Sequence, residues 1–168
     1  MRTSTLRFGA GLALPVLVAV AQAGEVALDK VPKPVLDAVQ ARFADTKVTG
    51  AGKEKTEAGN EVYEISLEDK DYRNIDVTVT PEGAIVLIEQ EITRKDLPEP
   101  VAKTLESKYP KAKYRIVEKL IEATEKEEKL TSYEVLLITT QKQIRAVQLD
   151  LEGKILKEEK KTSEEEED

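Results

Sequence analysis

The acidic side chains are the first candidates for chemistry in this sequence, which has 33 Asp and Glu residues but no histidine and no cysteine. Without these two residue types, the commonest general base, the commonest transition-metal ligand and the thiol nucleophile are all missing. Two neighbouring carboxylates can still transfer protons. Here, however, acids alternate with apolar residues, as in YEISLE from Tyr63 to Glu68, which is typical of the solvated face of a strand. We therefore predict no catalytic residues, no cofactor and no enzymatic activity.

Hard oxygen ligands also cluster in the stretch LEDKDYRN, where Asp69, Asp71 and Asn74 stand close together in sequence. An EF-hand loop would need an oxygen ligand at its fifth position, glycine at its sixth and glutamate at its twelfth. The corresponding positions hold arginine, asparagine and threonine, so the EF-hand pattern fails. A turn between two strands accounts for the same residues, and we predict no metal site there. Weak calcium binding stays open as the alternative.

The first 23 residues have the layout of a secretory signal peptide. Arg2 and Arg7 precede an apolar run, and Ala21-Gln22-Ala23 has the small-x-small pattern of a cleavage site. We predict cleavage after Ala23, no membrane anchor, and a periplasmic or secreted protein; a retained N-terminal anchor is the alternative. A secreted chain without cysteine has no disulfides and must be held together by burial alone.

The negative charge of the chain argues against two classes of partner, nucleic acids and anionic membranes. The formal charge is −7, and loss of the two arginines of the leader makes it −9. Nucleic-acid binding leaves a basic footprint that this composition lacks, and an anionic membrane surface attracts basic rather than acidic segments. The chain ends in five consecutive acids, so we predict a disordered acidic tail over residues 162–168.

The sequence between the leader and the tail repeats itself. VPKPVLDAVQARFA at residues 31–44 returns as LPEPVAKTLESKYP at residues 97–110. The stretch over residues 62–91 returns over residues 132–161, with YEI matching YEV and both copies carrying Glu-Gly. The first pair aligns at an offset of 66 residues and the second at 70, so the second copy has four extra residues, most simply in EATEKEEKLTS. A repeat of this length indicates a duplicated supersecondary unit.

Each copy is predicted to form one helix followed by four antiparallel strands. Pro-x-Pro suits a first helical turn, apolar residues then recur at helical spacing, and period-two alternation marks the strands. The glycine cluster GAGK at residues 50–53 indicates a bend or bulge in a weaker strand. We therefore predict an α+β fold in which two tandem αββββ repeats, residues 24–92 and 93–161, form antiparallel sheet with helices packed on one face. One unit of about 65 residues buries too little core alone, so the two should share an interior.

These motifs resemble the PepSY-like family of secreted bacterial proteins, which are β-lactamase-inhibitor-like. Residues 27–161 carry the resemblance: Pro-x-Pro-Val opening each helix, YEV in a strand, and an acidic residue with glycine before the last strand. The resemblance implies tandem units in one antiparallel sheet, and the binding or inhibition of another secreted protein. The β-lactamase inhibitor itself uses an aromatic-rich sheet braced by disulfides, whereas this chain has no tryptophan and no cysteine.

The predicted function is a non-enzymatic binding module that engages a secreted or envelope protein, such as a hydrolase, through its sheet face. Leu136 and Ile138 replace Ser66 and Glu68 of the first copy, so this strand is apolar on both faces. Either the protein's own helix or other unit covers it, or a partner does. The candidate contact residues are Leu136, Ile138, Ile144, Tyr72, Tyr114, Val86 and Ile88.

Two further expectations concern partners. The alternative function is a periplasmic sensor or buffer of a small ligand or cation, such as calcium, that uses the acidic surface of the chain. We expect no nucleic-acid partner, and a protein that is monomeric or dimerises weakly.

Overall fold

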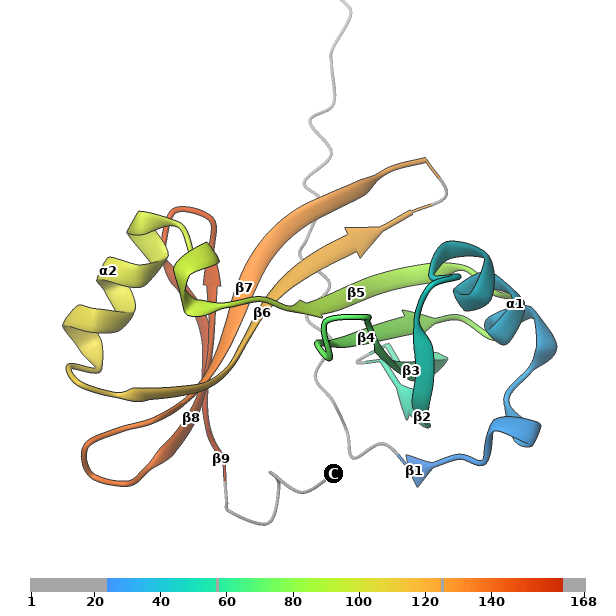
Figure 1. The fold of residues 1–168 in the computed structure, drawn as a ribbon, viewed down its shortest axis with the longest axis horizontal. Helices are drawn as coiled ribbons and strands as arrows, with labels where there is room; N and C mark the ends of the chain where they lie inside the picture. Colours follow the sequence, from blue (N-terminus) through green and yellow to red (C-terminus); the bar gives the residue numbers. More distant parts are fainter. Residues whose placement is uncertain (1–23, 57, 125, 162–168) are drawn as a thin grey trace, which may run out of the picture.

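The computed structural model of the protein describes residues 24–56, 58–124 and 126–161 (Figure 1). The predicted leader, residues 1–23, and the predicted tail, residues 162–168, lie outside the described residues. No helix in the described part of the chain is long and apolar enough to cross a membrane.

The described residues form one antiparallel sheet of nine strands, in which every strand pairs with its neighbours in the sequence. The strands are β1 (Gly24–Glu25), β2 (Lys47–Lys55), β3 (Glu61–Glu68), β4 (Asn74–Val79), β5 (Ile85–Glu91), β6 (Lys113–Ala123), β7 (Glu128–Ile138), β8 (Ile144–Asp150) and β9 (Ile155–Lys161). Helix α1 (Lys33–Arg42) follows β1, and helix α2 (Glu99–Lys108) connects β5 to β6. Short 3-10 turns, η1 (Leu28–Lys30) and η2 (Arg94–Asp96), precede the two helices. The predicted fold is confirmed.

The two helices are built in the same way. A proline stands at the N-cap and another within the first turn of each helix, where a missing N–H costs nothing. Each helix then buries two apolar residues one turn apart: Val35 and Val39 in α1, Val101 and Leu105 in α2. These residues form the single apolar stripe that packs on the sheet.

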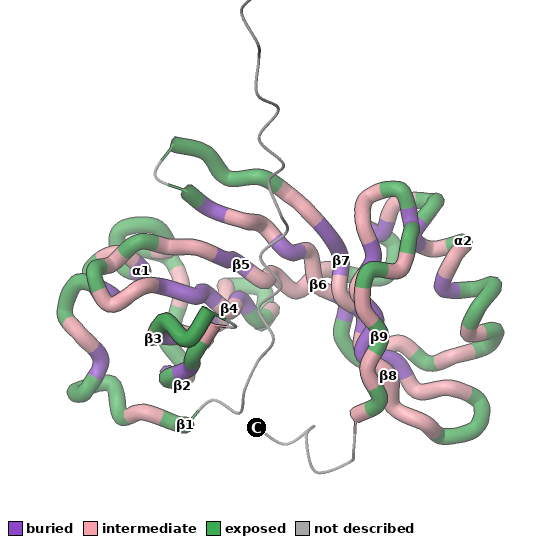
Figure 2. The backbone as a smooth tube through the Cα atoms, turned by 180° about the vertical axis from the view of Figure 1, so that it is seen from behind, coloured by how far each residue is buried: buried purple, intermediate pink, exposed green. Residues whose placement is uncertain are grey.

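Two separate core clusters lie on the same face of the sheet. The first contains Val35 and Ile65, and the second contains Val101 and Val135, all fully buried. Figure 2 shows buried and half-buried residues along the strands, and exposed residues at the turns. The expected shared interior is therefore corrected: each helix covers the strands of its own repeat, and the two repeats are joined by the pairing of β5 with β6.

The glycines of the two matching turns explain why both copies keep Glu-Gly. Gly83 and Gly153 have φ of +92° and +84°, a region that favours glycine. A Cβ on Gly83 would lie 2.7 Å from the carbonyl oxygen of Pro34, and one on Gly153 would lie 2.5 Å from that of Pro100. The turn after β4 or β8 therefore packs directly against the first turn of the helix of the same repeat.

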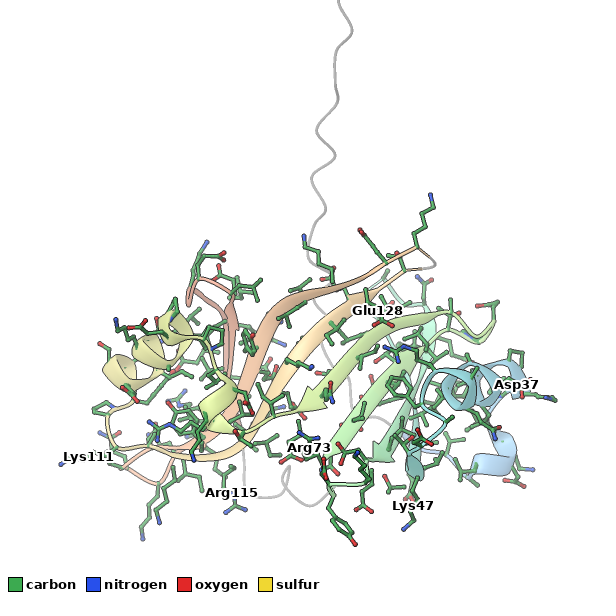
Figure 3. The ribbon with its side chains drawn as sticks, turned by 45° about the horizontal axis from the view of Figure 1, so that its top comes forward. Asp37, Lys47, Arg73, Lys111, Arg115 and Glu128 are labelled. Carbon is green, nitrogen blue, oxygen red and sulfur yellow. The ribbon has the colours of Figure 1, made fainter. Side chains whose placement is uncertain are left out.

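The four extra residues of the second copy lie in the β6–β7 hairpin, as predicted. Val48 pairs with Leu67 in the first repeat, and Tyr114 pairs with Leu137 in the second, so the second hairpin is longer (Figure 1). Near the tip of this hairpin, Glu128 (labelled in Figure 3) accepts two hydrogen bonds of 3.0 Å from the guanidinium of Arg42 in α1. The longer hairpin thus connects the second repeat to the helix of the first.

Candidate functional site

The two faces of the sheet differ in what covers them. The helix face carries both cores, because Val135 and Leu137 of β7 pack with α2, just as Ile65 and Leu67 of β3 belong to the core of α1. Alternate residues of the same strands point to the opposite side. We call this opposite side the helix-free face.

An apolar patch lies on the helix-free face of the second repeat. Leu136 pairs with Ala146 on β8 and with Ile116 on β6, and Ile138 pairs with Ile144. The apolar patch is Ile116, Leu136, Ile138, Ile144 and Ala146. Helix α2 does not cover the patch, because it packs on the other side of β7. Three of the predicted contact residues are thus brought together, and Ile116, which is 38% exposed, joins them.

The remaining predicted contact residues lie elsewhere. Val79 pairs with Ile85 and Thr78 with Leu87, so Val86 is the extra residue of a β-bulge. The bulge turns Ile88 into the first core at 2% exposure, which corrects the expectation that it belongs to a contact surface.

The two predicted tyrosines are also apart from the apolar patch. Tyr72 is 82% exposed in the turn between β3 and β4, next to Arg73 (labelled in Figure 3). Tyr114 is half-buried against the second core, with the guanidinium of Arg94 4.4 Å from its ring centre. Since Tyr114 pairs with Leu137, a core residue, it lies on the helix face. Neither tyrosine contributes to the helix-free face.

Carboxylates cross the centre of the helix-free face from strand to strand. Asp76 of β4 pairs directly with Glu89 of β5, and Glu118 of β6 pairs directly with Glu134 of β7. Glu64 of β3 pairs with Thr78, two residues from Asp76. The carboxylate row is Glu64, Asp76, Glu89, Glu118 and Glu134. All five side chains are half-buried, and like charges directly opposite one another destabilise a sheet.

Burial and crowding raise the pKa values in the carboxylate row. Desolvation is the largest cause in every case, and at Glu64, Glu89 and Glu118 the charges of neighbouring acids add to it. The pKa of Glu89 is raised to about 9, that of Glu118 to about 8 and that of Glu64 to about 7. The pKa values of Asp76 and Glu134 are raised as well, chiefly by desolvation. Glu89 and Glu118 therefore hold protons at neutral pH.

Glu54 extends the acidic character of this face into β2. It pairs with Val62 and is 4% exposed, and neither of its carboxylate oxygens has a hydrogen-bond partner in the described part of the chain. Desolvation raises its pKa, and its charge helps to raise the pKa of Glu64. A buried carboxyl group without a partner is unusual in a folded protein.

The carboxylate row corrects the expectation that the alternating acids form a solvated face. The two sides of β3 and β4 were assigned correctly, but the outward side of the central strands is half-buried. A usable signal exists in the sequence: Glu64 and Glu134 occupy equivalent positions of the two repeats, and joining the repeats edge to edge brings both into one sheet.

A pocket of about 590 Å³ opens beside the carboxylate row, where the first repeat meets β6 of the second. Its lining includes Val62, Thr78, Leu87 and Glu122 from four consecutive strands, with Val86 at its side. The pocket contains no pair of side chains suited to nucleophilic attack, since its polar lining is threonine, asparagine and glutamate.

The candidate calcium stretch is a turn whose carboxylate is already used. The Asp69 side chain accepts backbone hydrogen bonds from Asp71 at 2.7 Å and from Arg73 at 3.0 Å, and it also pairs with the Arg73 guanidinium. Thr139 forms the matching cap in the second repeat. Among the described residues, no group of three or more acidic side chains is arranged to hold a metal ion.

Comparison with known proteins agrees with the fold. The family model described as "Putative beta-lactamase-inhibitor-like, PepSY-like" matches the chain twice, over residues 18–87 and 80–157. None of the curated proteins matches the chain.

The chain is also similar to several solved structures. A protein of Bacteroides eggerthii described as "putative periplasmic" has a TM-score of 0.59 and 12% identity, over 77% of this chain and 88% of that one. A BLIP-like protein of Bacteroides fragilis has a TM-score of 0.54 and 18% identity, over 79% and 88%. A DUF2874 family protein of Bacteroides ovatus has a TM-score of 0.57 and 13% identity, over 79% and 89%. At these identities the similarity shows the fold alone.

Proposed function

This chain belongs to the PepSY-like, β-lactamase-inhibitor-like family, and we propose that it is a non-enzymatic, exported binding module. In this proposal it engages another secreted or envelope protein through the helix-free face of its sheet. Inhibition of a hydrolase is the sharpest form of the proposal, and it is supported by the likeness of the fold to a BLIP-like protein.

The observation that carries the proposal is the apolar patch. A strand with apolar residues on both faces needs cover on both faces. Helix α2 supplies this cover on one side through Val101 and Leu105, and the patch lies on the other side, where Leu136 pairs with Ala146 and Ile116. The first repeat has Ser66, Glu68 and Asp76 at the matching positions, so the patch is specific to the second repeat.

Export is proposed on two grounds. The first 23 residues have the charged, apolar and small-residue regions of a signal peptide. The Bacteroides eggerthii protein of similar fold is described as "putative periplasmic". Cleavage after Ala23 would release a chain without an anchor, and N-terminal sequencing of the exported protein would test this point.

Replacing Leu136 with aspartate is expected to weaken partner binding at least about tenfold, because it places a charge in the centre of the apolar patch. The measurement is capture of partners from a periplasmic and secreted extract, followed by titration of the purified partner. Leu156→Asp is the matched control, since Leu156 is 43% exposed and lies outside the patch. The half-buried position of Leu136 should leave the fold intact, as checked by circular dichroism.

Two results would count against this proposal. If the wild type captures no specific partner, the protein is not a binding module of this kind. If Leu136→Asp unfolds the protein while Leu156→Asp does not, the strand belongs to the core, and the patch is not a contact surface.

A further inference from the structure

We propose, resting on the function proposed above, that the carboxylate row receives lysine or arginine side chains from an extended segment of the partner protein. The row supplies several carboxyl groups side by side on the face that the partner would cover, and a bound cation would favour their ionised form. Charge complementarity of this kind orients a partner and excludes wrong ones. The occupant is therefore a basic segment flanked by apolar residues that rest on the apolar patch.

The first support is the lack of cations within the row. None of the five side chains forms an ion pair with another described residue. Lys157 and Lys161 of β9 approach only the end of the row, where they act on Glu134, and Lys157 is itself 2.9 Å from Glu159. When these acids ionise, like charges face one another on neighbouring strands and destabilise the sheet, so a bound cation would stabilise the ionised row.

Glu54 is the second and independent support. Its side chain is 4% exposed, both of its oxygens lack a partner, and its charge acts on Glu64 at the end of the row. Glu54 pairs with Val62, which alternates with Glu64 on the same side of β3, so it points to the helix-free face. A buried carboxyl group of this kind is a hydrogen-bond acceptor that the protein itself does not satisfy.

The shape of the row favours side chains over a metal ion. It runs across five strands from β3 to β7, which at a spacing of about 4.8 Å between strands is roughly 19 Å. Calcium needs six or more oxygens around one point, whereas these carboxylates lie along a line. An extended segment of about six residues would span that line and turn every second side chain toward it.

Cation binding should displace protons from the row. Glu89 and Glu118 hold protons at neutral pH, and a nearby lysine or arginine favours the ionised carboxylate. The other groups that face the row are Glu54 from β2, Glu91 from β5, and Lys157, Lys161 and Glu159 from β9. The affinity for a basic segment should therefore rise as the pH increases from 6 to 9.

A test is calorimetric titration of the full exported chain with a short peptide in which arginine alternates with valine. The double variant Glu89→Gln/Glu118→Gln should bind this peptide at least about tenfold more weakly at pH 8. Wild-type binding should release protons, seen as a heat that changes between buffers of different ionisation enthalpy. A peptide with glutamine in place of arginine should bind weakly to both proteins.

The control variant, Glu99→Gln/Glu106→Gln, removes the same number of carboxyl groups from exposed positions of α2 on the other side of the sheet. If the control variant binds the peptide as weakly as Glu89→Gln/Glu118→Gln does, the loss of binding reflects the net charge of the protein, and the inference is overturned. Binding without proton release would overturn it too. If calcium chloride raises the melting temperature and the peptide does not, the row is a metal site and the inference is overturned. If the wild type self-associates and Glu89→Gln/Glu118→Gln does not, the occupant is a second copy of the chain, which also overturns it.

Failure here can be told apart from failure of the proposed function. If Leu136→Asp abolishes partner capture and Glu89→Gln/Glu118→Gln leaves it unchanged, the binding module stands and the cationic contact is overturned. If neither variant changes capture, both ideas are overturned.

Discussion

The variant Glu89→Gln is expected to be more stable than the wild type at pH 9 and to lose this advantage near pH 4. Below pH 4.5, the ordinary pKa, Glu89 is protonated in the folded and the unfolded chain. Between pH 4.5 and about 9, the folded protein keeps the proton that the unfolded chain has released. Unfolding therefore releases a proton in this range, and the free energy of unfolding falls as the pH rises.

The size of the change in unfolding free energy follows from the size of the pKa shift of Glu89. One pKa unit corresponds to about 1.4 kcal/mol. Glu89 is half-buried, and part of its pKa shift comes from the charges of neighbouring acids such as Glu118 and Asp76, so the full shift does not appear as stability. We expect Glu89→Gln to gain about 2–4 kcal/mol over the wild type between pH 5 and pH 9.

Urea unfolding at pH 5, 7 and 9 would measure the effect. The matched control is Glu152→Gln, because Glu152 is exposed in the turn between β8 and β9. The control should change stability by the same small amount at each pH. A parallel pH profile for Glu89→Gln and the wild type would mean that the row is fully ionised in solution, which contradicts the pKa values given above.

Replacing Gly83 or Gly153 with alanine is expected to lower the free energy of unfolding by about 2–5 kcal/mol. Two costs add at each site. A residue with a Cβ is strained at positive φ, and the new methyl carbon would lie within 2.7 Å of a helix carbonyl oxygen. Backbone atoms of the first helical turn must then shift, and the helix loses its contact with the turn.

Gly59 provides a matched control, because its φ is +81° but no atom lies within 4 Å of an added Cβ. Gly59→Ala should cost only the conformational strain, about 1–2 kcal/mol. Denaturant unfolding at one pH compares the three variants directly. If Gly153→Ala costs no more than Gly59→Ala, the turn and the helix are not packed together.

The sequence predicted most of the fold because its signals are local. Helical spacing in VPKPVLDAVQARFA and alternation in VYEISLE assign each element and its two sides. The two offsets placed the insertion in the β6–β7 hairpin, and the GAGK cluster marked the bulge that begins after Val48. Helical spacing, alternation and the bulge depend on residues a few positions apart, and the offsets come from comparing the chain with itself, so one sequence is enough to find them.

The same local signals were wrong where a β-bulge or the pairing of strands determines which face of the sheet a side chain lies on. The bulge at Val86 moves Ile88 to the helix face, although simple alternation would keep both residues on one side. Tyr114 was predicted as a contact residue, but its pairing with Leu137 places it beside the second core. One extra residue in a strand reverses every side chain beyond it.

Local patterns were sufficient to identify the duplicated unit, the order of its elements and the apolar character of Leu136, Ile138 and Ile144. Strand pairing across the whole sheet was needed to show that carboxylates from five strands meet and that the glycine of each turn touches its own helix. Alternation is a property of one strand, whereas burial and pKa depend on which strands lie beside it and on how far water reaches. The pairing of β5 with β6, which joins the two repeats, brought Glu89 next to the acids of the second repeat.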